Sequence, residues 1–148
     1  MKSLKLLFLT LFIGASQLHA QAKVESIIYK FHPHYMTTDI GQTVAGTYLI
    51  EGKKQPIIEI NADGTGIIQL ANLSKKKITW GIECSDEGIP IFKEGYDSSS
   101  YTFWYKITGT GEWLYTQFLI IPGKKKMYLM GDRVKYYGET EVKNEESN

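Results

Sequence analysis

Residues 56–70 read PIIEINADGTGIIQL and hold two short apolar runs around a tight turn. Asp63-Gly64 is a strong β-hairpin signal, because both positions tolerate the positive φ that a two-residue turn requires. Isoleucine dominates both runs, and β-branched side chains suit a pleated sheet better than a helix. The stretch therefore predicts two antiparallel strands, over 56–61 and 66–70, joined by residues 62–65.

The same pattern of short apolar runs and turn residues continues along the chain. Of the 128 residues that follow residue 20, 48 are Ile, Thr, Tyr, Val, Phe or Trp, whereas Ala and Leu supply only ten. The remaining expected strands cover 24–31, 47–51, 77–84, 89–93, 101–107, 112–121, 126–130 and 134–138. Short strands with tight turns predict an all-β, antiparallel up-and-down barrel or barrel-like sandwich of about eight to ten strands. The best helix candidate is a turn or two over 37–44.

The first 20 residues have the three-part layout of a secretory signal peptide. Lys2 and Lys5 precede an apolar run at 6–13, and small residues follow at 14–20. The apolar run is too short to span a bilayer. We expect export to the periplasm or the outside, with cleavage after Ala20 or, as an alternative, after Ala22. A single β domain over 21–138 and a disordered polar tail over 139–148 complete the expected organisation.

The charge balance of the chain excludes two classes of protein. The formal net charge is +1, and removal of the leader with its two lysines leaves 15 basic and 16 acidic residues. A general nucleic-acid binder would show a large basic excess. With 43% hydrophobic residues, the chain is also too apolar for an acidic disordered protein.

Cys84 is the only cysteine, so an intramolecular disulfide cannot form. It continues the alternation of Ile78, Trp80 and Ile82, which predicts a buried and unreactive side chain on the apolar face of a strand. A reactive thiol or an intermolecular link is the alternative.

No pattern of catalytic or metal-binding residues stands out. His32-Pro33-His34 could place two rings on one strand face, but zinc usually takes three or four ligands. The G-x-S-x-G and H-E-x-x-H motifs are absent from the sequence. We therefore expect no metal, no cofactor and a non-catalytic protein, although an enzyme stays an open alternative.

The strand at 101–107 is apolar on both of its faces. Tyr101, Phe103 and Tyr105 share one face, while Trp104 lies on the other. Such a strand needs a covering layer, for example the N-terminal segment, or else one face lines a ligand cavity or a partner site.

Gly46-Thr47-Tyr48, the 61–66 hairpin and the downstream Trp80 resemble small exported bacterial lipocalin-like domains. Those domains often open with Gly-x-Trp, and here Tyr48 takes the place of the Trp. The resemblance implies a barrel with an apolar interior. It also implies that Arg133, the only arginine, packs across the Tyr48 ring, so that Gly46, Tyr48 and Arg133 close the barrel.

The leading expectation is a binding protein that holds a small apolar or amphipathic ligand inside the barrel. The expected lining residues are Trp80, Phe103, Tyr105 and Tyr115. The alternative is a protein-binding module, such as an inhibitor, an immunity protein or an envelope-assembly factor, which would bind another exported protein. Its exposed aromatic residues would include Tyr96, Tyr101, Trp104, Tyr136 and Tyr137.

Overall fold

The computed structural model describes residues 23–50, 56–122, 124–129 and 132–137, and these contain strands and turns but no helix. The expected leader at 1–20, both cleavage positions and the expected tail at 139–148 lie outside the described residues. Eleven strands are present in the described part: β1 (Val24–Tyr29), β2 (His32–Thr37), β3 (Gly46–Ile50), β4 (Pro56–Ile60), β5 (Thr65–Gln69), β6 (Lys75–Cys84), β7 (Phe92–Glu94), β8 (Ser99–Ile107), β9 (Leu114–Ile121), β10 (Lys124–Leu129) and β11 (Asp132–Tyr137).

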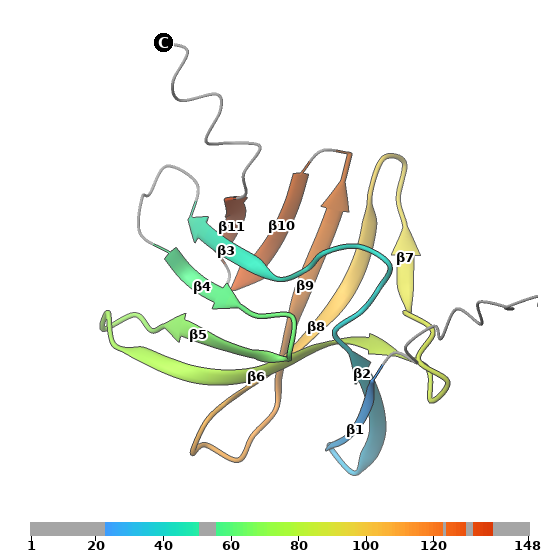
Figure 1. Ribbon diagram of the computed structural model, residues 1–148, viewed down its shortest axis with the longest axis horizontal. Coiled ribbons are helices and arrows are strands. Elements are labelled where there is room, and N and C mark those ends of the chain that lie inside the picture. Colours follow the sequence, from blue (N-terminus) through green and yellow to red (C-terminus); the bar gives the residue numbers. More distant parts are fainter. Residues whose placement is uncertain (1–22, 51–55, 123, 130–131, 138–148) are drawn as a thin grey trace, which may run out of the picture.

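Eight of these strands form an antiparallel ring (Figure 1). From β3 to β6 each strand pairs with the next, β6 then pairs with β8, and the order continues to β11. Pairing of β11 with β3 closes the ring. The all-β, up-and-down barrel expected from the sequence is confirmed.

The hairpin expected around Asp63-Gly64 joins β4 to β5. Gly64 has a φ of 86°, and the Thr65 amide donates to Asp63 Oδ1 at 2.9 Å. The Thr65 hydroxyl donates to the same oxygen at 2.6 Å. These bonds lower the pKa of the Asp63 carboxyl, because they stabilise its charged form.

The barrel interior is the main hydrophobic core, and it is rich in aromatic rings. Its side chains come from β3, β4, β5, β6, β8, β9 and β10, whose inward-facing residues meet there, and from Val44 just before β3. The largest of those that are fully buried are Trp80, Tyr48, Phe103, Phe118, Ile58, Ile68, Ile82 and Met127.

The β1–β2 hairpin lies outside the ring and extends the sheet from β6 (Figure 1). β2 is not among the strands expected from the sequence, and its second residue is Pro33, a residue type that is disfavoured within paired strands. Pro33 pairs with Ile28 of β1, whereas β2 meets β6 only through residues 35–37. Pro33 therefore lies where its missing N–H disrupts no ladder on the β6 side.

The helix candidate at 37–44 is wrong. Thr37 ends β2, and residues 38–45 form bends and irregular backbone that lead to β3. The Gly41 amide donates to Asp39 Oδ1 at 2.9 Å, and Gly41 itself has a φ of 76°. This short side-chain-to-backbone turn competes with a helix at the same residues.

Candidate functional site

The β1–β2 hairpin packs against the outer face of the barrel and forms a second hydrophobic cluster there. Ile27, Met36 and Trp104 are the buried members of this cluster, and Tyr29 and Trp113 pack against them. Gly81 of β6 pairs with Trp104, and its missing side chain leaves room for Met36. The hairpin thus covers the outer apolar face of β8, the strand that is apolar on both faces.

A hollow of about 320 Å³ lies where the hairpin meets β8 and β9, and we call it the aromatic pocket. Its lining residues are Tyr29, Lys30, His32, His34, Glu83, Thr102, Trp104 and Tyr115. Trp104 contacts three other rings, with centroids 4.9 Å from His34, 5.1 Å from Tyr29 and 5.2 Å from Tyr115. Tyr29 also contacts Tyr115 edge-on at 5.7 Å. Pairs in this range stabilise one another by about 0.5–1.5 kcal/mol beyond their buried area.

Trp104, which lines the pocket, carries an unsatisfied polar group. The residue is 2% exposed, and its Nε1 is buried without a hydrogen-bond acceptor among the described residues. A buried donor left unpaired costs about 1–3 kcal/mol, so native proteins rarely retain one. Tyr115, in contact with Trp104, is 57% exposed, so its ring can adjust around a ligand at little cost. An acceptor that enters beside Trp104 would regain that free energy.

The polar side of the pocket is a histidine–carboxylate pair. His34 Nδ1 donates to Glu83 Oε1 at 2.8 Å, and both side chains are half-buried. The bond fixes the imidazole plane against Trp104 and assigns the Nδ1 proton. In the neutral ring, Nε2 is then a hydrogen-bond acceptor. Lys30 lies with its Nζ 5.2 Å from the centre of the Tyr29 ring, which adds a cation at the rim.

The structure does not bring the four expected ligand-lining residues together. Trp80, Phe103 and Tyr105 lie inside the barrel, where Trp80 stacks on Phe103 with centroids 5.5 Å apart and an interplanar angle of 11°. Tyr115 lies outside the barrel, in the aromatic pocket. The Trp80 Nε1 already donates to the backbone oxygens of Asn61 and Thr65, at 3.0 Å each. Trp80 therefore anchors the β4–β5 hairpin.

The expected closure residues lie on the strands that close the ring. Gly46 begins β3, and the fully buried Tyr48 donates its hydroxyl to the Val44 carbonyl oxygen at 2.6 Å. In the β3–β11 ladder, Tyr48 stands opposite Tyr136, three residues from Arg133. The Arg133 side chain lies outside the described part of the structure.

The aromatic residues expected for the alternative protein-binding site are also not grouped on one surface. Tyr96 is fully exposed, but Tyr101 and Trp104 are 6% and 2% exposed. The side chains of Tyr136 and Tyr137 lie outside the described part. These residues therefore do not form one exposed patch within what the structure describes.

The sequence did not predict that Tyr29, His34 and Glu83 belong to one site. Lys30 and Phe31 have φ of 47° and 67°, so this two-residue hairpin turn has neither Gly nor Asn to reveal it. Without that turn, the fold-back that carries Tyr29 and His34 over Trp104 could not be predicted. The one available signal was Trp104 itself, an apolar residue on the outward side of β8.

Comparisons with protein-family models, curated proteins and solved structures found no match. Among the described residues, no three histidine, cysteine or acidic side chains gather where they could hold a metal ion. The described residues also contain no helix long and apolar enough to cross a membrane.

Proposed function

We propose that this protein is an exported, non-catalytic binding protein whose ligand is a small amphipathic molecule held in the aromatic pocket. The proposal keeps the ligand-binding expectation but moves the site from the barrel interior to its outer face. The export part rests on the layout of residues 1–20.

The observation that carries the proposal is the buried Trp104 Nε1, which has no acceptor among the described residues and lies within a cluster of four rings. Ligand sites characteristically combine apolar and aromatic walls with a few fixed polar groups. Here Tyr29 and Tyr115 supply ring surface, Trp104 supplies a donor, and His34 supplies a polar group fixed by Glu83. A ligand with a flat apolar face and a hydrogen-bond acceptor matches this arrangement.

Packing supports the outer site over the inner one. Trp80, Phe103 and Phe118 are at most 1% exposed, and ring contacts link Trp80 to Phe103 and Tyr48 to Phe118. A ligand among these side chains would have to displace packed rings, whereas the aromatic pocket already has open volume.

Binding of 4-methylumbelliferone, a flat neutral molecule with oxygen acceptors, tests the proposal by fluorescence anisotropy. Tyr115→Ala should weaken binding roughly tenfold, because ring stacking of this kind contributes about 1–3 kcal/mol. Tyr96→Ala is the matched control, since Tyr96 is exposed and lines neither the aromatic pocket nor the core. Equal affinity in the wild type and Tyr115→Ala, or no binding at all, would contradict the proposal.

A protein-binding function has one observation in its favour. The segment around β7 exposes four large apolar side chains, Ile89, Ile91, Phe92 and Tyr96. Contiguous exposed apolar residues often mark interaction sites. If this segment is the functional surface, Tyr96→Ala and Ile89→Ala should abolish binding to a protein partner, and Tyr115→Ala should leave that binding intact.

A further inference from the structure

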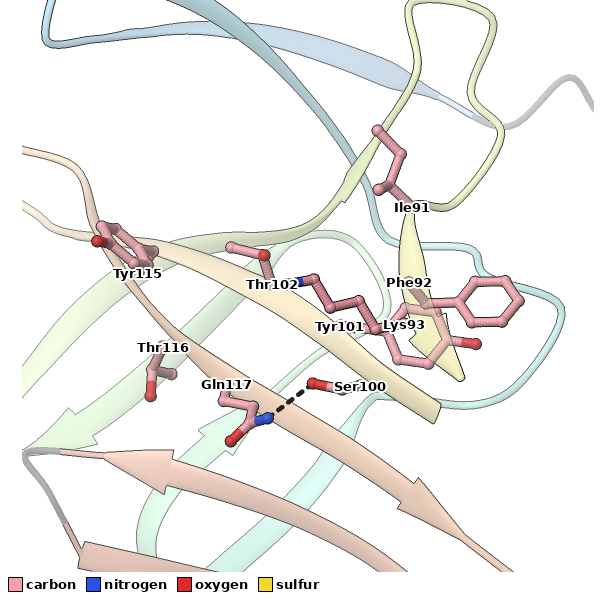
Figure 2. A pocket seen from close by; sticks show the side chains of 9 residues that line it. All are labelled: Ile91, Phe92, Lys93, Ser100, Tyr101, Thr102, Tyr115, Thr116 and Gln117. Carbon is pink, nitrogen blue, oxygen red and sulfur yellow. Dashed lines mark hydrogen bonds between the residues drawn. The ribbon is translucent and has the colours of Figure 1, made fainter. Parts of the chain in front are cut away.

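A second hollow, of about 310 Å³, is lined by residues in and next to β7, β8 and β9, and we call it the polar hollow (Figure 2). Strand pairing places Lys93 beside Ser100 and Thr102 beside Gln117, on the same face as the Trp104–Tyr115 pair. The Gln117 Nε2 donates to Ser100 Oγ at 2.8 Å, which holds the amide across the two strands (Figure 2).

The two hollows are neighbours, since Thr102 and Tyr115 line both. Ser100 and Trp104 are four residues apart on β8, which corresponds to about 13 Å along an extended strand. A two-ring molecule such as 4-methylumbelliferone is too short to contact both ends over that length. The continuous surface therefore fits an elongated ligand.

The chemistry of the polar hollow narrows the class of that ligand. Ser100, Thr102 and Thr116 offer hydroxyls and Gln117 offers an amide, groups that both donate and accept hydrogen bonds. The rest of the lining is largely apolar and consists of Ile91, Phe92, Tyr101 and Tyr115. Among the described residues, Lys93 is the one formally charged residue that lines the polar hollow. A lining that combines apolar rings with hydroxyl and amide groups suits a neutral ligand that has both C–H faces and hydroxyls, as a sugar has, and the exposed ring of Tyr115 suits the C–H face.

Two other elongated ligands fit less well. A peptide bound by strand addition would pair with the free edge of β7 or β1, the end strands of the sheet, whereas Ser100, Thr102 and Gln117 lie on β8 and β9, which are paired on both sides. A single-stranded nucleic acid needs a positively charged groove along its backbone. One lysine in the polar hollow and one in the aromatic pocket, where Glu83 offsets it, do not provide that charge.

We propose that the aromatic pocket and the polar hollow together bind a linear neutral oligosaccharide, with one sugar against Tyr29, Trp104 and Tyr115 and further sugars along Thr102, Gln117 and Ser100. This inference rests on the proposed function and names its ligand class. The Trp104 Nε1 donates to a ring or hydroxyl oxygen of the first sugar. The Gln117 amide exchanges its bond with Ser100 for bonds to a sugar farther along.

Calorimetric titration with neutral oligosaccharides tests the inference. The probes are series built from glucose, galactose, mannose or N-acetylglucosamine, with one, two, four and six units each. At least one series should gain about tenfold or more in affinity between one and four units, which corresponds to about 1.4 kcal/mol of added contacts. Gln117→Ala should remove that gain and leave 4-methylumbelliferone binding unchanged.

Gln69→Ala is the matched control, because Gln69 is a glutamine on β5 that lines neither hollow. It should bind every probe as the wild type does. If 4-methylumbelliferone binds but no series gains affinity with length, or if Gln117→Ala keeps the gain, the inference is overturned and the proposed function stands. If 4-methylumbelliferone also fails to bind, the proposed function fails and the inference fails with it.

Discussion

Met36 packs directly on the backbone of Gly81: a Cβ at Gly81 would lie 2.8 Å from the Cβ, Cγ and Sδ of Met36. Met36 belongs to the N-terminal hairpin and Gly81 to the barrel. The contact therefore fixes how closely the hairpin can approach, and with it the distance of Tyr29 and His34 from Trp104.

Gly81→Ala should push the hairpin away from the barrel and weaken the aromatic pocket. Overpacking of this kind costs about 1–3 kcal/mol, and here it should also lower the affinity for 4-methylumbelliferone. Urea unfolding and anisotropy measure the two effects. Met36→Leu is the volume-conserving control and should cost less than about 1.5 kcal/mol. Wild-type stability and binding in Gly81→Ala would show that the hairpin is not seated on this glycine.

Tyr48→Phe should destabilise the barrel although it keeps the ring. The Tyr48 hydroxyl donates to the Val44 carbonyl oxygen at 2.6 Å, and both residues are at most 1% exposed. Removal of the hydroxyl leaves a buried acceptor unpaired, at a cost of about 1–3 kcal/mol in the free energy of unfolding. Tyr115→Phe, at an exposed tyrosine, should stay within about 0.5 kcal/mol of the wild type. Equal costs for the two variants would mean that the Tyr48 bond contributes nothing.

Cys84 should react slowly with thiol reagents in the folded protein and rapidly in denaturant. The side chain is 2% exposed, and burial, together with the charge of Glu83, raises the pKa of its thiol above the usual 9.0. The folded state therefore favours the neutral thiol, and this contribution to stability is present below about pH 9 and lost as the pH rises through the raised pKa. Cys84→Ser should lack that alkaline loss. Similar labelling rates with and without denaturant would contradict the burial.

The mature chain should begin at Gln21 or, with the alternative cleavage, at Lys23. The basic start, apolar run and small-residue exit of residues 1–20 motivate this expectation. N-terminal sequencing of the exported material checks it. Recovery of Met1 from that material would falsify the signal-peptide interpretation.

Local chemistry was enough to predict the barrel but not the site. The Asp63-Gly64 turn and the alternation around Trp80 are short-range signals, and the structure confirms the β4–β5 hairpin and the all-β barrel. Barrel closure is harder to predict, because β3 and β11 pair across more than eighty residues.

The aromatic pocket depends on contacts that have no local signature. His34 and Glu83 are hydrogen-bonded although they are 49 residues apart in the sequence. Tyr29 contacts Trp104 in a hairpin whose chain reverses at Lys30 and Phe31. Tyr115 was predicted as a ligand residue, but its outward position depends on strand register, since a shift of one residue would move it to the other face.

The three tryptophan indole N–H signals in a proton–nitrogen NMR spectrum test most directly whether the ligand binds outside the barrel. Trp80 reports on the interior, where its N–H is bonded to Asn61 and Thr65, and Trp104 reports on the aromatic pocket. Titration with 4-methylumbelliferone should shift the Trp104 signal to saturation and leave the Trp80 signal in place, with Trp→Phe variants assigning each signal. A shift of the Trp80 signal with an unmoved Trp104 signal would place the ligand inside the barrel and contradict the proposed site.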